Sequence, residues 1–164
     1  MLSRERYEEL IRLSIQEAQL AMERGDDPFG GVITDSEGKV IVSGGNRQNS
    51  EKNPTAHAEM VLIREACKKL ETTDLSGCIS VCNAESCPMC ASALVLAGIR
   101  EFYFGVHMEP FCNPHIRMKD VLKASRGEFT LVDGILEEEC ADVMRRGREL
   151  HALSGTLPLY ARDS

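Results

Sequence analysis

The sequence lacks a long apolar segment, a basic run and an internal repeat. A membrane-spanning helix needs about 20 consecutive apolar residues. No stretch of this chain approaches that length, so we expect no membrane span. The opening residues MLSRERYEEL are charged where a secretory signal peptide would be apolar. These absences predict a cytoplasmic protein.

Acidic residues outnumber basic ones in the chain, with 26 Asp and Glu against 19 Lys and Arg and a formal net charge of −7. Proteins that hold phosphate backbones usually cluster positive charge on one surface or in one run of sequence. The absence of a basic run makes a nucleic-acid partner unexpected. It favours a small-molecule substrate instead.

The composition suits one globular domain over residues 1–164, because 43% of the residues are apolar and 27% are charged. Residues 154–164 carry no clear pattern and are expected to form a C-terminal tail. The seven cysteines form an odd set, and Cys67, Cys78 and Cys82 lie in apolar segments. This pattern favours reduced, buried thiols over a disulfide framework.

Apolar periodicity and end signals divide the chain into helices and strands. Helices are expected over residues 3–24, 53–70, 88–97, 115–125 and 135–153. Strands are expected over residues 30–34, 39–43, 78–83, 101–106 and 128–132. The first two strands should form an antiparallel hairpin, and a polar loop should cover residues 44–53. The order favours a three-layer α/β/α domain with a five-stranded mixed sheet.

Two short motifs carry candidate metal ligands: His57-Ala58-Glu59 and Cys87-Pro88-Met89-Cys90. Cys87 and Cys90 are three residues apart, which places both sulfurs on one face of the helix that they open. A helix N-terminus favours thiolate over thiol. A structural zinc site usually has four protein ligands, and the sequence holds no second CxxC to complete a zinc ribbon. A zinc ion with three protein ligands keeps its fourth coordination position for water, so this ligand set predicts a catalytic site.

Glu59 is the carboxylate that this ligand set leaves free. Zinc lowers the pKa of bound water from about 15.7 to about 7, and a nearby carboxylate can carry the released proton. Residues two apart are separated by roughly 200° around an ideal helix. His57 and Glu59 can therefore share one site only if their helix points its end at the metal.

The paired motifs resemble those of the zinc-dependent cytidine deaminase-like superfamily, in the branch that contains guanine deaminases, cytosine deaminases and tRNA adenosine deaminases. The resemblance runs from residues 27–31 (DPFGG) through residues 53–59 and 85–90 to residues 133–140. It implies a cytidine deaminase-like fold, a homodimer and hydrolytic removal of an exocyclic amino group with release of ammonia.

The same resemblance assigns roles to individual residues. It implies that His57, Cys87 and Cys90 bind Zn²⁺ and that Glu59 is the catalytic proton carrier. It also implies the following substrate-binding residues: Phe29 against the base, Asn46 as a hydrogen-bonding partner, the backbone of Ala58 beside the reacting centre, Ser86 in the pocket wall and Tyr160 in a tail that folds over the pocket. Ser86 departs from the family, which usually has proline there.

The substrate stays open at this stage. The Pro28-Phe29-Gly30 sequence looks more like the guanine deaminases than the tRNA enzymes, so guanine is favoured and cytosine comes next. Phe29 would equally suit an ordinary strand core. A tRNA-specific adenosine deaminase is the enzyme alternative, and a non-catalytic zinc-stabilised binding subunit is the other.

Four further polar residues are expected to be ordinary surface or loop positions. His107, Glu109 and His115 follow the fourth predicted strand, and His151 lies near the end of the last helix. A histidine there would place favourable charge at the negative end of the helix.

Overall fold

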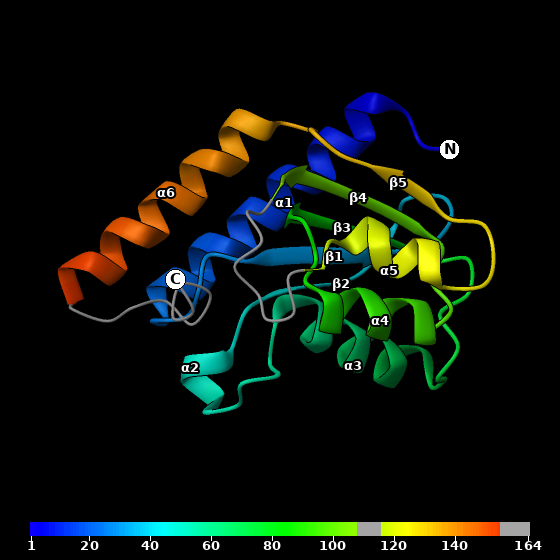
Figure 1. Ribbon diagram of the computed structural model, residues 1–164, viewed down its shortest axis with the longest axis horizontal. Helices are drawn as coiled ribbons and strands as arrows, with labels where there is room; N and C mark the ends of the chain where they lie inside the picture. The colour runs from blue at the N-terminus through cyan, green and yellow to red at the C-terminus, as the bar shows by residue number, and fades with distance from the viewer. Residues whose placement is uncertain (108–115, 155–164) are drawn as a thin grey trace.

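The computed structural model describes residues 1–107 and 116–154. Helices and strands alternate along most of the chain (Figure 1). In chain order the elements are α1 (Arg4–Glu23), β1 (Gly30–Thr34), β2 (Val40–Gly45), α2 (Gln48–Glu51), α3 (Ala58–Leu70), β3 (Ile79–Ala84), α4 (Pro88–Leu96), β4 (Glu101–Val106), α5 (Met118–Ala124), β5 (Thr130–Val132) and α6 (Glu137–Ser154).

The strands form one five-stranded sheet in the order β2-β1-β3-β4-β5. Strand β1 is antiparallel to both β2 and β3, whereas β3, β4 and β5 run parallel. Strand β3 lies in the middle, with Cys82 opposite Gly31 on one side and Phe104 on the other. The expected mixed sheet is confirmed.

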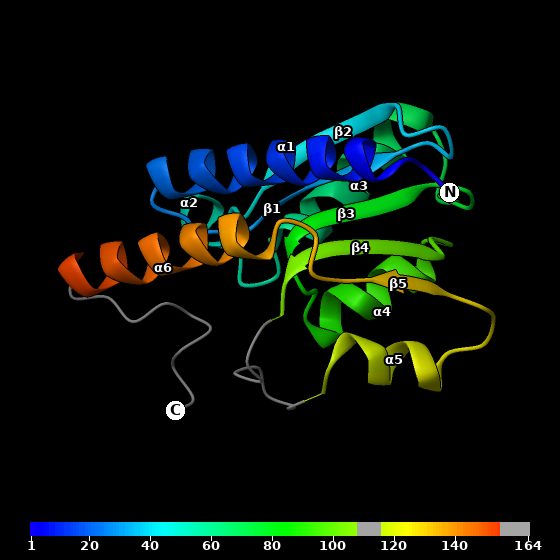
Figure 2. The same cartoon turned by 90° about the horizontal axis from the view of Figure 1, so that it is seen from above.

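Helices cover both faces of the sheet. Helices α1 and α6 lie on one side, and α3, α4 and α5 lie on the other (Figure 2). Each face has its own apolar core: Leu10 and Val143 belong to the first, and Leu62, Leu94 and Leu122 belong to the second. The three-layer α/β/α arrangement is therefore confirmed.

Local end signals set most of the helix boundaries. The Ser3 hydroxyl accepts a hydrogen bond from the backbone N–H of Arg6 and caps α1. Gly25 follows the end of this helix with a φ of 85°, a left-handed conformation that glycine adopts without steric cost. Gly98 ends α4 in the same way, with a φ of 93°. These positions agree with the sequence-based boundaries.

The region before α3 differs from the expectation. Residues 44–53 are not all loop, because β2 extends to Gly45 and the short helix α2 begins at Gln48. Asn53 does not cap a helix; its side chain accepts hydrogen bonds from the backbone and hydroxyl of Thr55. This local turn delays α3 until Ala58 and leaves His57 in an extended conformation as the N-cap residue.

The other boundaries shift less. Helix α5 is shorter than predicted, β5 begins two residues late, and α6 begins at Glu137. Within the described residues, no helix is both long and apolar enough to cross a membrane. The six cysteines in this part of the chain are all free thiols, in agreement with the prediction.

Helix α6 approaches β4 closely at Gly105. A Cβ atom built on Gly105 would lie 2.1 Å from the sulfur of Cys140 and 2.9 Å from the carbonyl oxygen of Asn83. We expect Gly105→Ala to lower the free energy of unfolding by about 1–3 kcal/mol because the core would be overpacked. Chemical denaturation measures this change.

The matched control is Gly44→Ala, where the nearest atom to the added carbon would be 3.7 Å away. Its cost should be clearly smaller. Equal stability losses for the two variants would contradict the close packing of α6 against β4.

Candidate metal centre and active site

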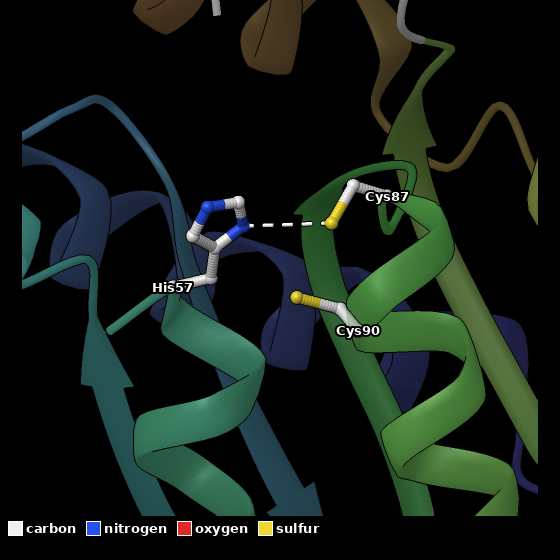
Figure 3. Close-up of side chains that lie close together, drawn as sticks. All are labelled: His57, Cys87 and Cys90. Carbon is white, nitrogen blue, oxygen red and sulfur yellow. Dashed lines mark hydrogen bonds between the residues drawn. The ribbon is translucent and has the colours of Figure 1, made fainter. Parts of the chain in front are cut away.

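The N-termini of α3 and α4 face each other across the candidate site. His57 is the N-cap residue of α3 and Cys87 is the N-cap residue of α4, and both have extended backbones. Figure 3 shows their side chains pointing toward one another, with Cys90 in the first turn of α4 directed into the same space. Two neighbouring helix ends thus supply all three candidate ligands.

The three donor atoms lie close enough to share one ion. One ligand atom from each of His57, Cys87 and Cys90 can be chosen so that all lie within 4.8 Å of one another. The Nδ1 atom of His57 is 3.5 Å from the sulfur of Cys87. A tetrahedral zinc ion with ordinary bond lengths holds nitrogen and sulfur ligands about 3.5 Å apart. The donor set therefore fits Zn²⁺ in both chemistry and spacing.

Both helices also favour negative ligands at this point. The positive ends of their dipoles meet at the site and favour negative charge there. Without a metal, the hydrogen bond with Cys87 and burial raise the pKa of the Cys90 thiol, so the ion itself must supply the remaining stabilisation of that thiolate. Pro88 occupies the first turn of α4, where a missing N–H costs nothing because that N–H would have no intrahelical acceptor. The Cys87-Pro88-Met89-Cys90 sequence therefore starts a helix and presents metal ligands with the same four residues.

Glu59 lies in the first turn of α3, beside the three ligands, and is only 7% exposed. Its carboxylate interacts with the side chains of Ser86 and Cys90. Burial and the negative charge of Cys87 raise the pKa of Glu59 above its ordinary value. His57 is the extended N-cap residue and not part of the helix itself. The rotation of roughly 200° between two helical residues two positions apart therefore does not separate its side chain from that of Glu59. The helix does point its end at the site, as the sequence argument required.

Ser86 and Ala58 complete the immediate surroundings, and both are buried. Ala58 is the first residue of α3, next to His57. The hydroxyl of Ser86 gives Glu59 a hydrogen-bonding partner that proline cannot offer. Ser86 thus adds a polar group beside Glu59.

Asn46 and Phe29 lie on neighbouring segments at the ends of β2 and β1. The backbone N–H of Asn46 donates to the carbonyl oxygen of Phe29 at 2.9 Å. The buried Asn46 side chain accepts from the N–H of Gln48 and donates to the Gln48 side chain at 2.7 Å. Gln48, which the sequence analysis did not single out, thereby fixes the orientation of the Asn46 amide.

Glu85 is a buried carboxylate that the sequence analysis missed. It accepts hydrogen bonds from the Arg117 guanidinium and from the backbone N–H of Met118, and it contacts His107. Burial alone would raise the pKa of Glu85, but Arg117 and His107 together lower it. Since Glu85 stands two residues before Cys87, this cluster ties the metal-ligand turn to the start of α5.

The remaining polar candidates fall in different places. His107 is 48% exposed and contacts Glu85 and Asp133 rather than the ligand set. His151 lies in the last turn of α6, as predicted, but its ring also binds Asp27. Glu109, His115 and Tyr160 lie outside the described residues, so the predicted tail contact remains a prediction.

Each of the three proposed ligands should be needed for metal binding. We expect Cys90→Ala to bind less than one tenth of the zinc bound by the wild-type chain, because removing one of three protein ligands leaves a weak two-ligand site. Metal analysis after dialysis measures the stoichiometry. Cys67→Ala, on α3 outside the cluster, is the matched control and should keep its zinc. Full zinc retention by Cys90→Ala would remove Cys90 from the ligand set.

Known proteins with similar sequences are named as deaminases of different substrates. The tRNA-specific adenosine deaminase of Bacillus subtilis is 35% identical over 136 residues, covering 82% of this chain and 83% of that protein. The probable cytosine deaminase of Schizosaccharomyces pombe is 32% identical over 139 residues, covering 79% and 84%. The guanine deaminase of B. subtilis is 41% identical over 83 residues, covering 50% and 53%.

The family described as the cytidine and deoxycytidylate deaminase zinc-binding region matches residues 4–106. This match includes α1, the four strands β1 to β4 and both metal-ligand motifs. The family's zinc-binding character agrees with the donor set that the two helix ends bring together. The chain belongs to the zinc-binding cytidine and deoxycytidylate deaminase family.

Proposed function

We propose that this deaminase hydrolyses the exocyclic amino group of a free nucleobase and releases ammonia, with guanine as the favoured substrate and cytosine next. The observation that carries the hydrolytic reaction is the convergence of His57, Cys87 and Cys90 beside the buried carboxylate of Glu59. Two sulfur ligands, one nitrogen ligand and a free carboxylate suit metal-assisted attack of water on an aminated ring carbon.

His57, Cys87 and Cys90 would hold Zn²⁺, which supplies a Lewis acid and makes water nucleophilic at neutral pH. Glu59 accepts the proton that the attacking water loses and passes it to a ring nitrogen. It then takes the second proton from the newly added hydroxyl group and transfers it to the departing amino group. A carbon–oxygen bond forms, a carbon–nitrogen bond breaks, and one water is consumed for each ammonia released. The raised pKa of Glu59 suits a group that must both take and give a proton.

Charge near Asn46 supports a small substrate. Arg24 donates to the carbonyl oxygen of Asn46 and pairs with Asp26, and Arg47 pairs with Glu51. These two cations are therefore already matched by carboxylates, and the whole chain carries a charge of −7. A polynucleotide would instead favour unmatched positive charge around the site. A half-buried Phe29 offers an apolar face to a flat ring.

Deamination of adenosine in tRNA is the second candidate. It is favoured by the B. subtilis tRNA-specific enzyme, which is 35% identical over 82% of this chain. A zinc-stabilised binding subunit without activity is the non-enzymatic alternative. We also propose that the chain acts as a homodimer in the cytoplasm.

An ammonia-release assay tests the substrate directly. The panel contains guanine, cytosine, adenine, their nucleosides and a tRNA anticodon stem-loop. We expect the highest kcat/KM with guanine or cytosine and much less with the stem-loop. Preferential deamination of the stem-loop would replace the free-base proposal with the tRNA candidate. A zinc-loaded protein that releases no ammonia from the whole panel would favour the binding subunit.

Glu59→Gln tests the proposed proton carrier. We expect kcat to fall by about 10²–10⁴-fold because the amide cannot accept the proton, while zinc content stays unchanged. Ammonia release and metal analysis on the same preparation measure both. The matched control is Glu65→Gln, a half-buried position on the same helix that pairs with Arg64. An unimpaired Glu59→Gln enzyme would exclude Glu59 from the mechanism.

A further inference from the structure

A largely buried hydrogen-bonded pair joins the end of the last helix to the segment that precedes β1. The ring of His151 on α6 lies 2.7 Å from a carboxylate oxygen of Asp27, although the two residues are 124 positions apart. The side chains of His151 and Asp27 are only 13% and 2% exposed. Burial raises the pKa of Asp27, and the neighbouring His151 opposes that shift. A carboxylate this deeply buried requires a partner.

The same segment is held by two further contacts. A Cβ atom built on Gly147 of α6 would lie 2.4 Å from the ring of Pro28, so the helix backbone rests directly on that proline. The Asn83 side chain donates to the carbonyl oxygen of Pro28 at 3.0 Å and accepts from the N–H of Gly30 at 2.9 Å. Residues 27–30 are therefore fixed by α6 on one side and by β3 on the other.

This segment borders the candidate active site. Asp27 and His57 interact electrostatically, and the backbone of Phe29 is bonded to Asn46. The N–H of Phe29 also donates to the carbonyl oxygen of Asp27 at 2.8 Å. A shift of Asp27 would therefore move Phe29. Small displacements of a group that positions the substrate can strongly lower the reaction rate.

We propose that Asp27 and His151 form a positioning pair that holds Phe29 in place against the substrate base. The inference rests on the proposed function, since it requires a flat ring to bind beside Phe29. Through His151, helix α6 would then contribute to the affinity for the substrate. Neither residue needs to contact the substrate, because the pair acts through the backbone of residues 27–29.

Direct binding of the base separates this role from catalysis. The Glu59→Gln protein, loaded with zinc, allows the dissociation constant of guanine and of cytosine to be measured by calorimetry without turnover. In this background we expect His151→Ala to raise the dissociation constant of the preferred base about five- to tenfold, as a coupled neighbour would. His151→Gln can still donate an N–H to Asp27 and should restore affinity to within about twofold.

A double-mutant cycle with Phe29→Ala identifies the route of the effect. If His151 acts through Phe29, adding His151→Ala to Phe29→Ala should weaken binding little further. Glu139→Gln is the matched control, because it removes an ion pair between α6 and Arg12 of α1 at the far end of the helix. Its dissociation constant should equal that of the parent protein.

Three results would overturn the proposal. The first two would exclude only the positioning role, and the third would also exclude the free-base function. A lower melting temperature for His151→Ala with unchanged base affinity would show a structural brace only. Fully additive effects in the cycle would show that His151 does not act through Phe29. Failure of both bases to bind the zinc-loaded parent would overturn the free-base function together with the positioning pair.

Discussion

The meeting of two helix N-termini is the constraint on which the rest of this structure depends. Strand β3 leads into α4, and its antiparallel neighbour β1 lies beside it. Helix α3 packs on the same face of the sheet as α4, with its N-cap residue His57 turned toward Cys87. The two helix dipoles then reinforce each other around the three candidate ligands, which offer two sulfur atoms and one imidazole nitrogen. A shift of either helix along the sheet would separate His57 from the cysteines and leave no shared metal position.

Glu59, Glu85 and Asp27 are buried carboxylates, and each has a specific partner. Glu59 interacts with Ser86, Glu85 is held by Arg117, and Asp27 is held by His151. Burying a carboxylate without a partner would be strongly unfavourable. Arg117 is the N-cap residue of α5 and His151 lies in the last turn of α6, so polar contacts as well as apolar packing hold these two helices in place.

Periodicity and end signals predicted the five strands, the five long helices and the layer arrangement. They failed around residues 53–57, where Asn53 and Pro54 looked like a helix start but Asn53 closes a turn onto Thr55. Both conformations satisfy the same local preferences. The observed turn is held by hydrogen bonds from the Arg47 N–H to the Ala56 carbonyl oxygen and from the Gln48 side chain to the Pro54 carbonyl oxygen. The error mattered, because the observed turn is what leaves His57 free to face Cys87.

The sequence by itself determined the chemistry: the donor types, their order, and the spacing that puts two sulfurs on one helical face. These properties follow from local geometry and from the affinity of imidazole and thiolate for zinc. Only the tertiary structure decided that Arg117 would hold Glu85, that Gln48 would orient Asn46, and that His151 would reach Asp27. Such partners are separated in sequence or face several competing groups, and packing alone brings one of them within hydrogen-bonding distance.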